Sequence, residues 1–166
     1  NWIIYGEILG YVPGTQTFIQ KGFDYKCDVG ECDFYVYKIA IKNPDGKTIY
    51  LDDLQIREWC NEVGLKYADT LLYYGTIMEF IVRYSQLTPA KIKKLIDKFA
   101  QGDNEIFDLF FQICKDRYLE NDCYMCNNNV PAEGIVVRVN KLNYYEAYKL
   151  KSNRFKEYEN GQLDAG

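Results

Sequence analysis

The stretch EGIVVRVNKLNYYEAYKLKSNRF, residues 133–155, begins with a carboxylate and contains two short runs typical of β-strands, GIVVRV and AYKLK. In the second run Lys149 and Lys151 are two residues apart, so both side chains leave the same face of a strand. Tyr148 and Leu150 then point to the opposite face, toward a core. Because two adjacent ammonium groups repel each other, the pattern requires either an anion beside them or exposure to water.

Two interpretations of this stretch are open on spacing alone. Lysines on a solvated edge strand discourage unwanted pairing, and Glu133 would then be an ordinary loop acid. The alternative is a phosphate clamp formed by Lys149 and Lys151, beside a Glu133 carboxylate that binds Mg²⁺ directly or through water. The spacing by itself favours the edge strand, so the decision depends on the rest of the chain.

Outward from this stretch, the sequence alternates between strand-like and helix-like patterns. Runs rich in β-branched and aromatic residues lie at residues 2–12, 33–42 and 48–51. The NPDGK between the last two runs is typical of a hairpin turn. Helical patterns with start and stop signals lie at residues 52–64, 88–102 and 104–120. The sequence predicts a single α+β domain, with antiparallel sheets and helices inserted between the sheet sections.

The composition is that of a folded chain, with 166 residues of which 48% are apolar, 16 tyrosines and 9 phenylalanines. No apolar run approaches the roughly 20 residues of a membrane-spanning helix, and we expect no membrane partner. The net charge of −4 argues against a nucleic-acid binder, but residues 138–156 carry six basic side chains against one acidic one, Glu146. Such a local basic face can bind phosphates whatever the total charge.

The chain has six cysteines, Cys27, Cys32, Cys60, Cys114, Cys123 and Cys126. The middle two lie in helical patterns among apolar neighbours, which is typical of small buried hydrophobic residues. The pair Cys27 and Cys32 and the pair Cys123 and Cys126 could together supply four thiolates to zinc. The spacing of the first pair is loose for a zinc site, however, and the two pairs are far apart in the sequence. We expect free thiols in a reducing cytosol rather than a structural metal.

Four segments resemble, in order, the motifs of the covalent nucleotidyltransferases, the superfamily of RNA ligases, DNA ligases and capping enzymes. These are IYGEILG for motif III, DFYVYKI for motif IIIa, EGIVVR for motif IV and YKLKS for motif V. The likeness is strongest to the bacteriophage RNA ligase 2 family, because the loop VPGTQTFIQKGFDY between the first two motifs also follows that family's pattern. The resemblance covers nearly the whole chain. It implies part of an adenylyltransferase domain of the ATP-grasp-like ligase type.

The resemblance implies that Glu7 binds the ribose of ATP and that Tyr37 stacks on the adenine, where the family also uses Phe. Both rings present the same π-face, so the change is tolerable. Without the resemblance, Tyr37 would be interpreted as core packing. Glu7 lies in an apolar run between two glycines, where a ligand can approach the backbone and where a carboxylate needs a hydrogen-bond donor such as a sugar hydroxyl.

The same resemblance implies that Glu133 serves the metal and that Lys149 and Lys151 contact the α-phosphate, with Arg138 as a further basic residue at the nucleotide. The implied cofactors are ATP and Mg²⁺. The implied reaction seals an RNA 3′-hydroxyl to a 5′-phosphate through lysyl-AMP and RNA-adenylate intermediates, as in RNA repair.

The nucleophile of the family is the lysine of a Lys-x-Asp-Gly or Lys-x-His-Gly motif upstream of motif III. The only similar segment here is KNPDGK, but Lys42 is one residue too far from Asp45, follows motif III, and lies in the expected hairpin turn. We reject it as the nucleophile. We therefore expect residues 1–166 to be the C-terminal two-thirds of the adenylyltransferase domain, with motif I and the family's separate RNA-binding domain outside this sequence.

These inferences together predict an ATP-dependent RNA ligase whose partners are RNA ends and ATP. We expect it to be monomeric and cytoplasmic. This expectation includes a virus-encoded enzyme that acts in the host cytoplasm. Two alternatives are open: a non-catalytic nucleotide- or RNA-binding module, and a DNA ligase or capping-type nucleotidyltransferase. The short spacing between motifs III and IIIa and the QKGFDY loop favour the RNA ligase.

Overall fold

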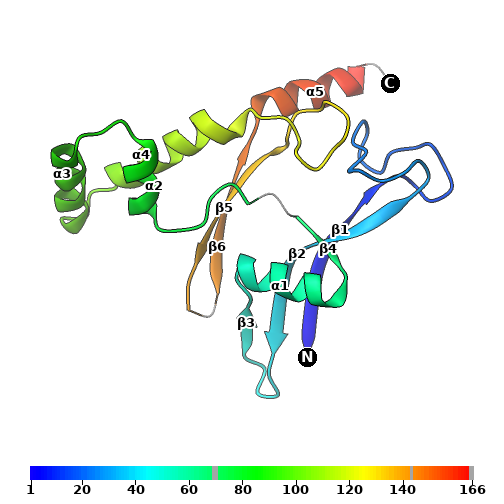
Figure 1. Cartoon of the computed structure of the whole chain (residues 1–166), viewed down its shortest axis with the longest axis horizontal. Coiled ribbons are helices and arrows are strands. Elements are labelled where there is room, and N and C mark those ends of the chain that lie inside the picture. Colours follow the sequence, from blue (N-terminus) through cyan, green and yellow to red (C-terminus); the bar gives the residue numbers. More distant parts are fainter. Residues whose placement is uncertain (69–70, 143, 165–166) are drawn as a thin grey trace.

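The computed structural model describes residues 1–68, 71–142 and 144–164 (Figure 1). Its elements in chain order are β1 (Trp2–Gly10), β2 (Cys32–Lys42), β3 (Thr48–Tyr50), α1 (Asp53–Val63), β4 (Lys66–Tyr67), α2 (Ile77–Tyr84), α3 (Pro89–Ala100), α4 (Glu105–Cys114), the π-helical turn η1 (Lys115–Leu119), β5 (Gly134–Asn140), β6 (Tyr145–Lys151) and α5 (Asn153–Asp164). The predicted α+β class with antiparallel sheets is confirmed. Among the described residues, no helix has both the length and the apolar character that crossing a membrane requires.

The first sheet is built around β2, which pairs antiparallel with both β1 and β3. The predicted hairpin turn is confirmed, since Asn43 N–H donates to the Lys47 carbonyl at 3.0 Å. The short strand β4 pairs with β2 in parallel, which the sequence did not predict. Two residues are too few to show the period of a strand.

A β-bulge interrupts the pairing of β1 with β2. The register passes from Tyr5 opposite Lys38 to Gly6 opposite Val36, so Tyr37 is an extra residue of β2. Bulges bend a strand and redirect a side chain, and they are frequent beside functional sites. Tyr37 is half exposed, so it is not the core residue that its sequence context alone indicated.

Helix α1 covers one face of this sheet. Asp52 caps its N-terminus in a capping box with Gln55, and Gly64 ends it in the left-handed conformation at φ 73°. The buried Ile56 and Cys60 of the helix pack against Val36 and Ile39 of β2. Because side chains alternate along a strand, the opposite face of the sheet carries Tyr5, Glu7, Tyr35 and Lys38.

A second core joins the inserted helices to the β5–β6 ribbon. Its buried members are Phe80, Ile81, Ile106, Phe110, Ile113, Cys114 and Ile135. Figure 1 shows α2, α3 and α4 grouped at one end of the molecule, with α4 continuing through η1 toward the ribbon. The predicted helix over residues 104–120 is therefore α-helical only to Cys114, and α2 was not predicted. Cys60 and Cys114 are both buried, as expected.

Strands β5 and β6 form the predicted antiparallel ribbon, in which Lys149 pairs with Val136 and Lys151 with Gly134. The two lysines share one face, as predicted. On the other face Leu150 packs against the second core, whereas Tyr148 is 45% exposed and its ring meets the Phe111 ring edge to face. Tyr148 therefore faces the second core, as predicted, but is not buried in it, because this end of the face is covered only in part.

The segment after β6 forms helix α5, which the sequence did not predict. The Glu120 carboxylate accepts hydrogen bonds from the backbone N–H groups of Asn153 and Arg154, both at 3.0 Å, and from the buried Ser152 hydroxyl at 2.8 Å. The backbone N–H groups at the start of α5 have no partner within the helix. They donate instead to a carboxylate that lies 32 or more residues earlier in the sequence. Phe155 packs with Phe23 and Val130 in a third core under the long loop after β1.

Candidate functional site

Glu133 and Lys149 form an ion pair at the start of the ribbon. Their Oε1 and Nζ atoms are 2.7 Å apart, and their side chains are 45% and 56% exposed. The position of Glu133 depends on the next residue, Gly134, whose φ is 151°. A Cβ on Gly134 would lie 2.0 Å from the Leu150 carbonyl oxygen, so only glycine lets the strands approach this closely. The close approach holds the Glu133 carboxylate beside the lysine.

Lys151 has a second carboxylate as its counter-ion. Its ammonium lies 3.2 Å from Glu159 of α5 and 5.0 Å from the centre of the Phe155 ring. Each lysine of the pair on β6 is therefore neutralised by its own acid, Lys149 by Glu133 and Lys151 by Glu159. Exposed ion pairs of this kind are worth about 0–1 kcal/mol, so an incoming phosphate can replace either carboxylate at little cost.

Tyr25 lies in the loop between β1 and β2, and groups from both sheets influence the pKa of its phenol. Burial first, then the neighbouring Cys123 and Cys126 and the carboxylates of Glu133 and Glu7, raise the pKa of its phenol well above the usual range. Glu7 comes from β1 and Glu133 from the start of β5, so the phenol lies within electrostatic range of the predicted ribose-binding acid and the predicted metal-binding acid. The structure thus brings these two sequence-predicted residues to one neighbourhood.

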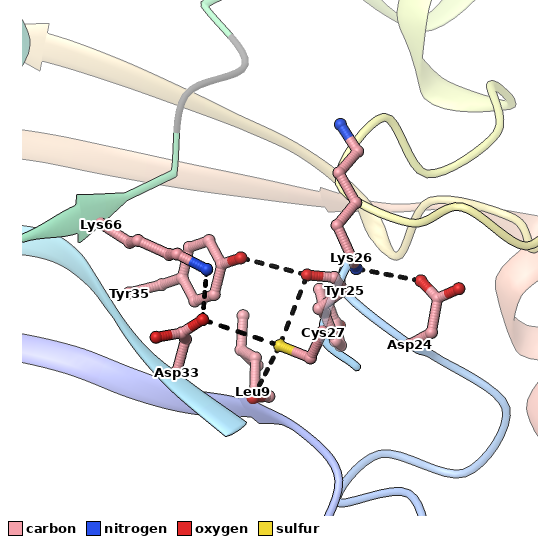
Figure 2. Close-up of polar contacts among 8 residues, drawn as sticks. All are labelled: Leu9, Asp24, Tyr25, Lys26, Cys27, Asp33, Tyr35 and Lys66. Carbon is pink, nitrogen blue, oxygen red and sulfur yellow. Dashed lines mark hydrogen bonds and ion pairs between the residues drawn. The ribbon is translucent and has the colours of Figure 1, made fainter. Parts of the chain in front are cut away.

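The loop that carries Tyr25 is held in an unusual conformation. Tyr25 and Lys26 both have positive φ, at 47° and 56°, although neither is glycine. The Tyr25 carbonyl accepts hydrogen bonds from the Tyr35 hydroxyl at 3.0 Å and from the Cys27 thiol at 3.6 Å (Figure 2). The Tyr25 hydroxyl donates to Gln20 Oε1. Contacts at both ends of the residue hold Tyr25 in this conformation.

Figure 2 also shows where the first cysteine of the supposed zinc set lies. The Cys27 thiol points toward the Leu9 carbonyl at 3.6 Å and the Asp33 carboxylate at 4.0 Å, and Asp33 is paired with Lys66. Burial and then the Asp33 charge raise the pKa of Cys27. Within the part of the chain that the structure describes, no three His, Cys, Asp or Glu side chains gather to hold a metal. The expectation that no zinc binds stays a prediction.

The predicted nucleotide-binding residues of the first sheet are accessible. Glu7 is exposed and lies opposite Tyr35, on the face of the sheet that α1 does not cover. Tyr37 sits at the bulge with half of its surface exposed. An exposed aromatic ring on a redirected strand and a carboxylate nearby on the adjacent strand are the groups that a purine and a ribose need.

Arg138 has partners of a different kind. Its guanidinium donates to the Leu51 carbonyl and lies 3.8 Å from the centre of the Tyr145 ring. Burial lowers its pKa. The ammonium of Lys38 lies over the rings of Tyr5 and Tyr145, at 4.3 and 5.9 Å from their centres. These residues bind the far end of the ribbon to the first sheet, and the predicted contact of Arg138 with the nucleotide stays a prediction.

The residues present fit Mg²⁺ better than a metal caged by protein alone. Mg²⁺ is commonly held by one or two carboxylates together with waters and substrate phosphates. Glu133 supplies one exposed carboxylate, and no cluster of three potential ligands surrounds it among the described residues. Glu133 could therefore bind a magnesium ion that arrives with a phosphate ligand.

The sequence did not identify Tyr25, Glu159 or Lys38 as functional or supporting residues. Tyr25 lies in the QKGFDY loop that carries the resemblance, which was the available signal for it. For Glu159 the helical spacing from Phe155 places both residues on one side of α5, but α5 itself was not expected. Lys38 gives no signal, because its three tyrosine partners come from different strands.

A family model described as RNA ligase matches residues 1–156 of this chain. The matched span includes all the residues that the sequence predicted for the site. It ends within α5, before Glu159.

Proposed function

This chain belongs to the RNA ligase family, and on that premise we propose that its site serves the ATP-dependent sealing of RNA ends. The observation that carries the proposal is the exposed Glu133–Lys149 ion pair with Lys151 on the same face of the ribbon. Two cations two residues apart, each with an exchangeable carboxylate, form a site that accepts a phosphate. Glu7 and Tyr37 on the first sheet supply complementary groups for the ribose and the adenine.

In the proposed reaction an enzyme lysine attacks the α-phosphorus of ATP, a P–N bond forms, and the bond to pyrophosphate breaks. The AMP then passes to an RNA 5′-phosphate, and a 3′-hydroxyl displaces it to form the phosphodiester. Negative charge increases on the non-bridging oxygens in each step. Fixed ammonium groups at Lys149 and Lys151 would stabilise that charge more in the transition state than in the ground state.

The lysines also change partners in this proposal. Before the nucleotide binds, Glu133 and Glu159 neutralise them at 2.7 and 3.2 Å. With a phosphate in the place of these acids at the ammonium groups, the Glu133 carboxylate would be available to hold Mg²⁺, which would supply positive charge for the phosphates of the nucleotide. Tyr25, held by Gln20, lies within electrostatic range of both Glu7 and Glu133.

We further propose that the chain is the C-terminal part of an adenylyltransferase domain and that the complete enzyme is a monomer in the cytoplasm. Support for the first point comes from the order of motifs III, IIIa, IV and V with no Lys-x-Asp-Gly among the 166 residues. Lys42 lies at the end of β2, where the hairpin turn begins, and its backbone N–H donates to the carbonyl of Asn1, on the N-terminal side of β1, at 2.8 Å. This position does not favour Lys42 as a nucleophile.

The test is transfer of labelled AMP. We expect the 166-residue chain, incubated with α-labelled ATP and Mg²⁺, to show no covalently labelled band after denaturing electrophoresis. The same chain joined to its natural upstream sequence should become labelled and should then ligate RNA. A labelled band from the short chain that disappears in Lys42→Ala would overturn our assignment of the hairpin. Tight nucleotide binding without any label in the longer chain would point to a non-catalytic module, and labelling followed by joining of DNA alone would point to a DNA ligase.

A further inference from the structure

Cys123 and Cys126 lie in a tight turn next to the candidate site. Cys126 N–H donates to the Cys123 carbonyl at 3.3 Å, the i to i+3 contact of a β-turn, which brings the two Cα atoms within about 7 Å. Disulfides span Cα separations of about 4.4–6.8 Å, so the turn can accommodate one. Both cysteines are partly accessible and are free thiols.

The two thiols differ in character. Cys123 sulfur accepts a hydrogen bond from the Cys126 thiol and from the backbone N–H groups of Met125 and Cys126, and these bonds lower the pKa of Cys123 against the effect of burial. The bond to Cys123 and burial raise the pKa of Cys126. A thiol whose anion is stabilised by donors, beside a second thiol that stays protonated, is the arrangement of an attacking and a resolving cysteine.

The turn is also bound to the loop that carries Tyr25. Asp24 accepts hydrogen bonds from the backbone N–H groups of Asn127 at 2.8 Å and Asn128 at 3.2 Å. The Asn128 side chain donates to the Gly22 carbonyl, and Tyr25, Cys123 and Cys126 all pack against the core formed by Phe23, Val130 and Phe155. A change of bonding between Cys123 and Cys126 therefore acts on the loop that carries Tyr25.

We propose that Cys123 and Cys126 form an oxidation site for hydroperoxides, and that the disulfide formed there loosens the loop of residues 20–26. The Cys123 thiolate attacks one peroxide oxygen, so that an S–O bond forms, the O–O bond breaks, and the departing hydroxide takes up a proton as water. The Cys126 thiol loses its proton and attacks the Cys123 sulfur, the S–S bond forms, and the S–O bond breaks to release a second water. The dithiol loses two electrons and hydrogen peroxide gains them. The proposal does not depend on the function proposed above.

The chain offers an internal control for the test. Trypsin cleavage after Arg117 and Arg138 places Cys123 and Cys126 on one peptide, residues 118–138, whereas cleavage after Lys26 and Lys38 places Cys27 and Cys32 together on residues 27–38. The pKa of Cys27 is raised, so the second peptide should keep its thiols. Each pair can therefore be followed separately by alkylation and mass spectrometry after a graded addition of hydrogen peroxide to the reduced protein.

We expect peptide 118–138 to lose both alkylatable thiols, and a mass equal to two hydrogen atoms, at peroxide levels that leave peptide 27–38 reduced. Cys126→Ser should trap a sulfenic acid at Cys123, while Cys123→Ser should leave Cys126 unreactive. Cys27→Ser should behave like the unchanged protein. Equal oxidation of both peptides, or two surviving thiols on peptide 118–138, would overturn the proposal. Protection of both peptides by one added zinc ion per chain would instead establish a four-thiolate metal site.

The effect on the loop has its own measurement. Amide hydrogen exchange across residues 20–26 should be at least several-fold faster in the disulfide form than in the dithiol form. A Cys123→Ser, Cys126→Ser double variant should show no change on addition of peroxide. Identical exchange in the two forms of the unchanged protein would show that the disulfide forms without loosening the loop, and that half of the proposal would be wrong.

Discussion

The β5–β6 ribbon carries cations at both of its ends, and the two ends use them differently. At the start of β5, Lys149 and Lys151 are exposed and paired with carboxylates that water can also reach. At the far end, Arg138 is half buried and is bound to a backbone carbonyl and an aromatic ring. All three share one face of the ribbon. The burial and partners of a basic side chain, more than its charge or its face, separate a binding role from a supporting one.

The largest effect that tests this difference is expected at Lys151. In the full-length enzyme, Lys151→Ala removes a charged contact to phosphate worth roughly 1.5–3 kcal/mol. Lysyl-AMP formation should fall by about one to two orders of magnitude, since each ~1.4 kcal/mol is tenfold. Single-turnover labelling with ATP measures this. The melting temperature should stay the same, because the residue of this strand that packs in the core is Leu150. Normal labelling of Lys151→Ala together with a native melting curve would show that the two lysines only form the solvated edge of a strand.

The opposite result is expected at Arg138. Arg138→Ala leaves the Leu51 carbonyl without its donor and removes the cation from the Tyr145 ring, which should lower the free energy of unfolding by about 1–3 kcal/mol. Part of the stabilisation is already offset, since the buried Arg138 Nε finds no hydrogen-bond partner among the described residues. Denaturant unfolding gives the value.

Arg138→Lys is the matched control, because it keeps the charge and loses the fork of the guanidinium. The stability of Arg138→Lys should lie between that of the unchanged protein and that of Arg138→Ala. Adenylylation per folded molecule should be unchanged in both Arg138→Ala and Arg138→Lys. If Arg138→Ala instead abolished labelling at full stability, Arg138 would belong with the phosphate-binding lysines, as the sequence predicted.

The smallest effect concerns pH and the start of α5, the helix that supplies the counter-ion of Lys151. Hydrogen bonds from Asn153 N–H, Arg154 N–H and the Ser152 hydroxyl lower the pKa of Glu120 below its ordinary 4.5. A lowered folded-state pKa contributes stability above pH 4.5 that is lost as the pH falls through the lowered value. Glu120→Gln should be less stable near neutral pH and should approach the unchanged protein in acid. A difference in unfolding free energy between Glu120→Gln and the unchanged protein that stays constant from pH 7 to pH 3 would contradict this prediction.

The parts of the fold that the sequence predicted correctly are those that a few adjacent residues determine. Alternation placed Lys149 and Lys151 on one face, and the NPDGK turn fixed the β2–β3 hairpin. The bulge at Tyr37 could not be foreseen, because it arises from pairing between two strands. Helix α2 was missed because eight residues hold only two turns of the helical period.

In the candidate site, too, local sequence motifs could be interpreted, whereas contacts between distant segments could not be predicted. The motif resemblance predicted roles for Glu7, Glu133 and the two lysines residue by residue, and these roles stay predictions. It could not give the counter-ions of the lysines, because the Glu133 pairing joins two strands and the Glu159 pairing requires a helix that the sequence did not indicate. Nor could it show that Arg138 is bound to Leu51, which is 87 residues away.

The distances along the chain bear on when the site forms during folding. Each sheet is largely made of hairpins between neighbouring strands, whereas the bonds that bind the halves together join Asp24 to Asn127, Lys21 to Gln162 and Leu51 to Arg138, across 103, 141 and 87 residues. Closing such long loops costs entropy before any contact is gained, so we expect the hairpins to form first and the site last. Substitutions in the bridging contacts should then accelerate unfolding and leave the refolding rate nearly unchanged.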